Sequence, residues 1–326
     1  MSVPAAEATG HAAAGTQAGP AAPARGDDLL DCLIVGAGPA GLTAATYLAR
    51  FQRKVALLDS GLSRARWIPT SHNCPGFPFG VGGDALLDKL RDQAQRYGIQ
   101  PTDARVDALR RDGEGPAVRF TAIAGARQWQ ARCVILACGV RDRLPDVPGI
   151  EAAIDTGAVR LCAICDGYEA RDERIAVYGQ VDEAMGHAAF LRTFSRTVAV
   201  LPSSTEAPTA ETRADAARTG VALLPHASLR IDAGRCVATT DDGQAHVFDT
   251  LYPVLGSDAQ TALALALGAR CDDNAELIVD RRQQTSVDGL YACGDMVSAL
   301  NQIGVAVGHA AIAATAVHNR LPRNLR

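Results

Sequence analysis

The chain has 326 residues, of which 48% are hydrophobic and 5% aromatic, and its formal net charge is −4. A chain of this length has room for two domains with ample core, and the lack of a basic block together with few aromatic residues argues against nucleic acid as a partner. Nine cysteines, an odd number in a core-rich chain, argue against a secreted disulfide scaffold and predict a reducing, cytoplasmic environment.

Residues 1–28 are predicted to form a disordered tail. They consist mainly of Ala and Gly with some Pro and Thr, so they bury too little apolar surface to offset their chain entropy. The segment lacks the basic start and apolar run of a secretory signal. No stretch of the chain reaches about 18 consecutive apolar residues, so we expect no transmembrane helix.

Order is predicted to begin with a strand at residues 31–36, a glycine turn, a helix at 39–53 and a second strand at 54–59. The turn reads Gly36-Ala37-Gly38-Pro39-Ala40-Gly41. Its glycines permit a tight turn, close approach of a pyrophosphate and close packing of helix on strand, and the helix N-terminus favours an anion. Asp59, which ends the second strand, suits a ribose hydroxyl. The unit therefore predicts a dinucleotide site.

The remaining elements predict a second unit of the same kind. A loop at 60–82, a helix at 83–97 and strands near 106, 118–123 and 133–137 precede a connection after residue 140. A strand at 174–179, a helix to residue 194 and a strand at 197–201 follow. A return strand near 248–255 leads to a strand at 288–295 and a helix ending near 320. We predict an α/β chain of two Rossmann-like, three-layer ββα domains: 29–145 with 250–326, and an inserted domain at 146–249.

Cys162-Ala163-Ile164-Cys165-Asp166 lies in the predicted inserted domain. Two thiols at this spacing can form a disulfide and carry two electrons, and Asp166 can exchange a proton with the leaving thiolate. The alternative is half of a zinc site, but no second Cys-x-x-Cys or His-x-His pair exists, so we predict no metal. A dithiol and a dinucleotide site in one chain indicate an enzyme that moves electron pairs.

The other chemically capable side chains have ordinary interpretations. Cys138 and Cys293 are expected at tight backbone positions, and His72 is either solvated or close to a bound flavin. His309 is expected to pack within the last helix. Inert roles are predicted for the cysteines in strand-like or loop segments, which are Cys32, Cys133, Cys236 and Cys271.

From residue 31 to residue 320 the chain resembles the low-molecular-weight thioredoxin reductases, because four motifs occur in the family's order. They are the glycine turn at 36–41, Asn73-Cys74-Pro75-Gly76, Cys162 to Asp166, and Cys293-Gly294-Asp295 followed by Asn301-Gln302-Ile303. The resemblance implies a homodimer that binds FAD.

The resemblance also assigns roles to residues of these motifs. The FAD pyrophosphate would lie on the glycine turn, including Pro39 and Ala40. Asn73 would contact FAD, Gly294 and Asp295 would hold its ribityl and pyrophosphate region, and Gln302 and Ile303 would meet the isoalloxazine. Gly139 ends Ala137-Cys138-Gly139, which stands where the family usually has Ala-Thr-Gly.

Two departures make NADPH a doubtful cofactor. The family's Gly-x-Gly-x-x-Ala loop reads Gly179-Gln180-Val181-Asp182-Glu183-Ala184, and we expect the Val181 side chain to obstruct a pyrophosphate. The strand that normally ends in His-Arg-Arg ends in residues 201–206, Leu-Pro-Ser-Ser-Thr-Glu, without a cation for a 2′-phosphate. This pattern resembles the NADPH-independent branches: ferredoxin-dependent and diflavin-type reductases, and dithiol oxidases of the gliotoxin type.

The resemblance implies a disulfide oxidoreductase in which Cys165 faces the flavin, Cys162 attacks a partner disulfide and Asp166 transfers the proton. A rotation of the inserted domain would alternate between flavin and partner. The partner would be a thioredoxin-like protein or a small disulfide or dithiol, and ferredoxin is a candidate electron donor. Two alternatives stay open: a dithiol oxidase that uses oxygen, and a flavin-binding redox sensor without steady turnover.

Overall fold

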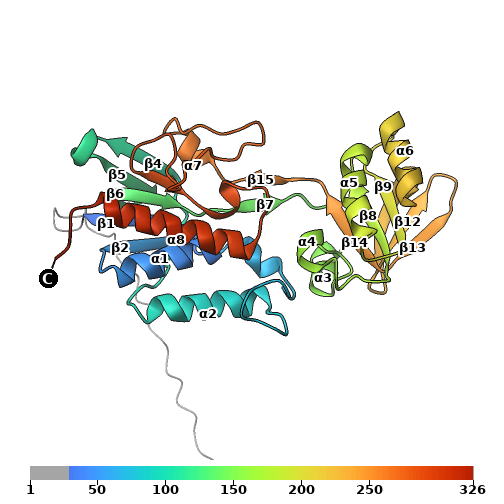
Figure 1. Ribbon diagram of the computed structural model, residues 1–326, viewed down its shortest axis with the longest axis horizontal. Coiled ribbons are helices and arrows are strands. Elements are labelled where there is room, and N and C mark those ends of the chain that lie inside the picture. The colour runs from blue at the N-terminus through green and yellow to red at the C-terminus, as the bar shows by residue number, and fades with distance from the viewer. Residues whose placement is uncertain (1–28, 326) are drawn as a thin grey trace, which may run out of the picture.

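The computed structural model describes residues 29–325, so the predicted disordered tail lies outside the described residues. Two α/β domains lie side by side and are joined by a narrow two-stranded ribbon (Figure 1). We call residues 29–142 with 257–325 the first domain and residues 143–256 the second domain. The predicted fold class, two Rossmann-like domains with the second inserted into the first, is confirmed.

The first domain is built on a seven-stranded sheet of order β3-β2-β1-β6-β5-β4, with β16 also paired to β6. Strands β1, β2, β3 and β16 run parallel to their neighbours, whereas β4, β5 and β6 form an antiparallel meander. The strands are β1 Leu30–Val35, β2 Val55–Asp59, β3 Thr102–Asp103, β4 Ala108–Asp112, β5 Arg119–Ala124, β6 Arg127–Leu136 and β16 Leu290–Ala292.

Three helices cover one face of this sheet (Figure 1). They are α1 Pro39–Arg50, α2 Gly83–Gln95 and α8 Ile303–Arg320. The buried positions of α8 are Ala306, Ala310, Ala313, Ala314 and Val317, a helical spacing of small side chains. Because these side chains are small, α8 packs closely against α1 over the core, and the N-terminus of each helix is held near the carboxyl ends of the strands.

Three of the short elements of the first domain, η2 Arg64–Trp67, η4 Gly294–Met296 and α7 Ala262–Leu265, lie in the wall of the cavity where the cofactor is expected. The predicted loop at 60–82 contains η2, a 3-10 turn, and the strand expected near residue 106 is replaced by β3 and β4 on either side of it. Two further 3-10 turns are η3 Gly115–Ala117 and η4, and α7 is a short helix.

The second domain has a parallel sheet of order β10-β9-β8-β14 and an antiparallel sheet of order β11-β12-β13. Its strands are β8 Arg174–Gly179, β9 Thr197–Pro202, β10 Ala222–Leu223, β11 Ala227–Asp232, β12 Arg235–Thr240, β13 Ala245–Phe248 and β14 Thr250–Val254. Its helices are α3 Ile150–Asp155, α4 Ala163–Asp166, α5 Val181–Leu191 and α6 Ala210–Thr219.

The predicted domain boundary at residue 250 is wrong. Strand β14 pairs in parallel with β8, with Tyr252 opposite Val177, so it completes the sheet of the second domain. The chain returns to the first domain only after Val254, through β15 Ser257–Ala259, which pairs with β7 Val140–Asp142 to form the ribbon. The buried run Thr250-Leu251-Tyr252 explains the difference, because it is covered by second-domain core on both faces.

Within the described residues, no helix combines the length and the apolar character that crossing a membrane requires.

Candidate functional site

The three glycines of the first turn have different structural roles. Gly36 has φ of +102°, and a Cβ there would lie 2.3 Å from the Ala137 carbonyl oxygen. A Cβ on Gly41 would lie 1.7 Å from the Gly36 carbonyl oxygen. A Cβ on Gly38 would meet only the Ser63 hydroxyl, at 3.3 Å. Gly36 and Gly41 are therefore required by internal packing, whereas Gly38 leaves an open surface toward the cavity.

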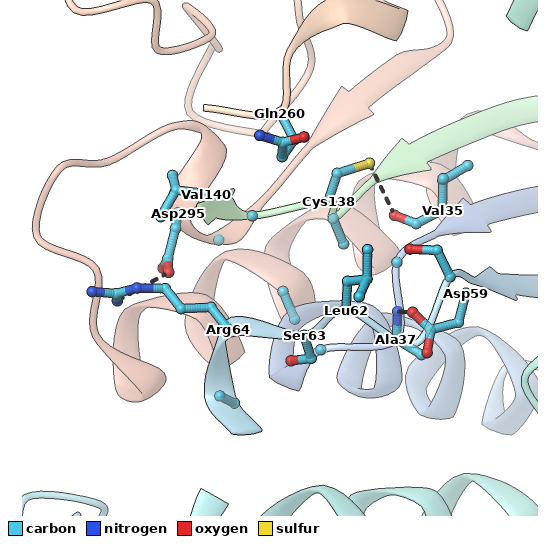
Figure 2. A pocket seen from close by; sticks show the side chains of 18 of the residues that line it. Val35, Ala37, Asp59, Leu62, Ser63, Arg64, Cys138, Val140, Gln260 and Asp295 are labelled. Carbon is cyan, nitrogen blue, oxygen red and sulfur yellow. Dashed lines mark hydrogen bonds and ion pairs between the residues drawn. The ribbon is translucent and has the colours of Figure 1, made fainter. Parts of the chain in front are cut away.

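The N-terminus of α1 has the features of an anion-binding site. Gly38 is the N-cap and makes no side-chain cap, Pro39 follows it, and no acidic residue lies in the first turn. The backbone N–H groups of this turn are therefore free to donate to a phosphate. The Asp59 carboxylate accepts a hydrogen bond from the Ala37 N–H at 3.1 Å and so also fixes the glycine turn (Figure 2).

A cavity of about 400 Å³ extends from this turn along the carboxyl ends of the strands. Of the residues predicted to bind the cofactor, its wall contains Gly36, Gly38, Pro39, Ala40, Asp59, Gly139, Gly294, Asp295, Gln302 and Ile303. Gly41 lies behind the wall, and Asn73 lines a neighbouring cavity. An open glycine face, uncapped helix donors and a carboxylate at the strand end suit the phosphates and ribose of FAD.

Arg64 is a site residue that sequence reasoning missed. Its guanidinium forms two hydrogen bonds to Asp142, at 2.6 and 2.8 Å. It also lies 3.7 Å from the Asp295 carboxylate (Figure 2). Burial raises the pKa of Asp295, and Arg64 opposes that rise. The contact connects the cofactor wall to strand β7 of the ribbon. Arginine in a predicted loop carries no spacing signal, so no pattern could have identified it.

The dithiol lies against Gln302, which lines the first cavity. Cys162 caps α4 by accepting a hydrogen bond from the Cys165 N–H at 3.2 Å, and the two sulfurs form a disulfide. The Gln302 side-chain nitrogen lies 3.4 Å from the Cys162 sulfur and 3.3 Å from the Cys165 sulfur. Asn73 donates to the Gln302 side-chain oxygen at 2.8 Å. Gln302, which is predicted to meet the flavin, therefore contacts the dithiol directly, and Asn73 holds Gln302.

A second cavity, of about 370 Å³, lies between the two domains beside the disulfide. Both cysteines, Asp166 and His72 line it. It shares with the first cavity the residues Arg64, Ile68, Asn301, Gln302 and Ile303. The two cavities are therefore adjacent, and the disulfide lines the second of them.

Asp166 is partly buried and is held by second-domain side chains. The Tyr252 hydroxyl donates to one carboxylate oxygen at 2.9 Å, and Arg160 lies 3.7 Å from the other. Burial raises the pKa of Asp166 to about 6, against the opposing effects of Arg160 and the Tyr252 hydrogen bond. Such a carboxyl can give and take a proton near neutral pH. Sequence reasoning missed Tyr252 and Arg160, because a tyrosine in a buried strand gives the same pattern as a core residue.

The other thiols lie in apolar surroundings. Burial raises the pKa of Cys138 and of Cys293 to about 12, and that of Cys133 and of Cys236 to about 11. Cys138 nevertheless lies in the wall of the first cavity, where its thiol donates to the Val35 carbonyl (Figure 2). A raised thiol pKa disfavours the reactive thiolate.

His72 and His309 lie in different surroundings. His72 lies 3.9 Å from Glu169 of the second domain and lines the second cavity. His309 lies within α8, and burial lowers its pKa. Among the described residues, no group of three or more His, Cys, Asp or Glu side chains could hold a metal ion.

The second dinucleotide unit departs from the expectation at Val181. This side chain is 5% exposed and packs in the second-domain core, so the expected obstruction by its bulk is not seen. The packing of α5 determines which way the Val181 side chain points, and a sequence motif does not show that packing. The first turn of α5 instead carries two exposed acids, Asp182 and Glu183. Asp182 accepts hydrogen bonds from Thr209 and Thr212 at the start of α6.

Comparisons with known proteins agree with this geometry. The family model for pyridine nucleotide-disulphide oxidoreductases matches residues 30–310. The thioredoxin reductase of Mycolicibacterium smegmatis is 33% identical over 279 residues, which cover 82% of this chain and 88% of that protein. The crystal structure of HlmI has a TM-score of 0.83 at 28% identity, covering 90% of this chain and 92% of that one.

A thioredoxin reductase from Streptococcus pyogenes gives a TM-score of 0.81 at 26% identity, with 90% of this chain and 98% of that chain covered. The match of the family model spans both domains, the glycine turn and the dithiol. The chain belongs to the pyridine nucleotide-disulphide oxidoreductases and is a flavoprotein disulfide oxidoreductase of the thioredoxin reductase-like type.

Proposed function

We propose that this enzyme passes electron pairs between FAD, the Cys162–Cys165 dithiol and a disulfide partner, and that NADPH does not drive it efficiently. The observation that carries the proposal is the contact of Gln302 with both sulfurs, at 3.3 and 3.4 Å. The glycine turn, Asp59 and Asp295 would hold FAD, which when bound supplies the two-electron exchange with the dithiol. The relatives named as thioredoxin reductases support a thioredoxin-like partner.

The proposed exchange assigns one role to each residue of the motif. Cys162 gives its proton to the Asp166 carboxylate, and its thiolate attacks one sulfur of the partner disulfide. The other partner sulfur leaves as a thiolate and takes that proton from Asp166. The Cys165 thiol then gives its proton to the Asp166 carboxylate and attacks the Cys162 sulfur. This step restores the Cys162–Cys165 disulfide and releases the second partner thiolate, which takes the second proton from Asp166. Two electrons and two protons thus pass from the dithiol to the partner.

Partner access requires movement of the second domain. The disulfide faces the first domain, where Gln302 covers it, whereas Ile164 between the two cysteines is exposed. A rotation about the β7–β15 ribbon would separate the dithiol from Gln302 and open it to a protein. We also propose a homodimer, which analytical ultracentrifugation of the purified protein tests.

The case against NADPH rests on charge. Two exposed acids, Asp182 and Glu183, stand in the first turn of α5, where a pyrophosphate would lie on the helix N-terminus. Residues 203–206, which follow β9, are Ser-Ser-Thr-Glu and offer no cation to a 2′-phosphate. We therefore propose another donor, with reduced ferredoxin as the first candidate.

A second candidate function is a dithiol oxidase that delivers electrons from a small dithiol to oxygen. The cavity of about 370 Å³ beside the disulfide favours it, because this volume lies in the range of small-molecule sites. Anaerobic bleaching of the flavin, with NADPH, NADH, reduced ferredoxin and dithiols offered in turn, tests the electron donor. Oxygen consumption on addition of a dithiol would favour the oxidase.

A further inference from the structure

A polar network lies beside the dithiol; it is anchored on two buried residues of strand β14, and its charged members are partly exposed. Thr250 and Tyr252 lie two residues apart, so their side chains leave the same face of the strand, and they are 1% and 2% exposed. Tyr252 donates to the Asp166 carboxylate, and Thr250 donates to the Glu173 carboxylate. Polar groups this deep are retained where each has a partner.

Arg160 joins the two carboxylates. Its guanidinium lies 3.7 Å from Asp166 and 3.8 Å from Glu173. Its backbone N–H donates to the Leu251 carbonyl at 2.9 Å, so β14 also fixes the segment that carries it. Arg160 and Asp166 both line the interdomain cavity together with the two cysteines. Strand β14 thus fixes the positions of both Tyr252 and Arg160, the two side chains that approach the Asp166 carboxylate.

We propose that Tyr252, assisted by Arg160, is a positioning residue that holds the Asp166 carboxyl beside the dithiol during the proton transfers of thiol–disulfide exchange. This inference rests on the proposed function, in which Asp166 takes one proton from each cysteine in turn and gives it to a leaving partner thiolate. No oxidant or reductant beyond the dithiol and the partner disulfide is needed for these transfers.

The network belongs wholly to the second domain. Arg160, Asp166, Glu173 and Tyr252 all lie between residues 143 and 256, whereas Gln302 and Asn73 belong to the first domain. A rotation that takes the dithiol away from Gln302 therefore keeps Asp166 and its partners together. The Asp166 carboxyl therefore keeps the same hydrogen bond and ion pair whether the dithiol faces the flavin or the partner.

Four neighbouring groups act on the Asp166 carboxyl besides its burial. Arg160 and the Tyr252 hydrogen bond lower its pKa, while Glu169 and Glu173 raise it. Burial raises the pKa of Tyr252 itself, so its hydroxyl stays a donor. Removing this donor destabilises the carboxylate relative to the acid. The Asp166 pKa must then rise, and the pH at which the carboxyl titrates must move upward.

The test is the pH dependence of thiol–disulfide exchange between the reduced full-length protein and dithiodipyridine. Asp166→Asn identifies the inflection that belongs to this carboxyl, because the variant lacks it. We expect Tyr252→Phe to move that inflection upward by about one pH unit, since a hydrogen bond to a charged group is lost. Tyr178→Phe, on β8 and packed in the other core cluster of the same sheet, should leave it in place.

An unmoved inflection in a folded Tyr252→Phe protein, with only a uniform change in rate, would overturn the inference and leave the proposed function intact. If Tyr252→Phe does not fold, Arg160→Gln serves instead, because losing the cation must also move the inflection upward. An unmoved inflection in that variant has the same meaning. Failure of the reduced wild-type protein to exchange with dithiodipyridine at any pH would instead refute the proposed function itself.

Discussion

Asn73 and Gln302 are 229 positions apart in the chain, yet the Asn73 side-chain amide donates to the Gln302 side-chain oxygen at 2.8 Å. The Gln302 side-chain nitrogen lies against the two sulfurs of the disulfide and also donates to the Leu300 carbonyl at 3.3 Å. Ser71 in turn donates to Asn73 at 2.9 Å. Polar side chains of the first domain thus lead from the loop at 71–73 to the dithiol of the second domain, past the end of the cofactor cavity.

The purified protein should be yellow with non-covalent FAD, and Gly38→Val should abolish flavin retention. Gly38 has φ of −73° and ψ of −173°, which valine adopts without strain, so the variant should fold. Its side chain would enter the cavity that receives the pyrophosphate. The measurement is the ratio of bound flavin to protein after gel filtration.

Gly186→Val is the matched control, because a Cβ at Gly186 meets nothing within 4 Å. It should retain flavin like the wild-type protein. Full flavin occupancy in Gly38→Val, or a colourless wild-type protein that FAD cannot reconstitute, would contradict the assignment of this cavity.

The two cysteines should differ in role. Cys162→Ser should leave a thiolate at Cys165 that gives a charge-transfer absorption band with oxidised flavin, while turnover is lost. Cys165→Ser should block electron flow from the flavin and still allow Cys162 to trap a disulfide partner covalently. Absorption spectra and mass spectrometry of trapped adducts measure the two effects. Identical behaviour of the two variants, or full activity in either, would refute the division of roles.

Much of the fold follows from local patterns. The glycine turn, the alternation of strands with helices and the Ala-rich last helix each depend on residues close together in sequence. They predicted β1, α1, β2, α2, β8, α5 and α8 with errors of a few residues at the ends. Helix α6 and strands β10 to β13 were missed, since their alternation is weak and charged residues interrupt it.

The parts of the site that could not be predicted depend on long-range contacts. Arg64 meets Asp142 and Asp295 only because η2, β7 and η4 converge at the carboxyl ends of the strands. Tyr252 meets Asp166 only because β14 completes the second-domain sheet. The Val181 side chain turns into the core because of how α5 packs. Sequence spacing contains none of these relationships.

The stability of the protein should depend on the charge of Asp166. Burial raises its pKa from 3.8 to about 6, so the native state binds this proton more tightly than the unfolded chain does. The resulting stability is present below the unfolded pKa and is lost as pH rises through the folded pKa. Asp166→Asn lacks this dependence. As the pH rises, the unfolding free energy of the variant should therefore increase relative to that of the wild-type protein, by up to about 3 kcal/mol between about pH 3 and pH 7.

Denaturant unfolding of both proteins across this pH range provides the measurement. The two proteins are compared by how their unfolding free energies change with pH, not by the values at one pH. This comparison removes the constant effect of leaving Arg160 without its carboxylate. Unfolding free energies that run parallel in the two proteins would show that this carboxyl is not perturbed in the folded state.

NADPH should be a poor electron donor for the bound flavin. A pyrophosphate at the start of α5 would meet the negative charges of Asp182 and Glu183, and a 2′-phosphate would find no cation at residues 203–206. Each charge-assisted phosphate contact contributes roughly 1.5–3 kcal/mol, so the loss of two would weaken binding by several orders of magnitude. Stopped-flow bleaching of the flavin under anaerobic conditions, with NADPH and NADH compared, gives the rates.

The chain also offers a gain-of-function comparison for NADPH. The double variant Ser203→Arg/Ser204→Arg places two cations directly after β9, where a 2′-phosphate would lie. It should raise the bleaching rate with NADPH more than the rate with NADH, because only NADPH carries that phosphate. Adding Asp182→Asn and Glu183→Gln should raise both rates, since both cofactors carry the pyrophosphate. Rapid stoichiometric bleaching of the wild-type flavin by micromolar NADPH would show that the second domain binds this cofactor despite its charges, and would place the enzyme among the NADPH-driven thioredoxin reductases.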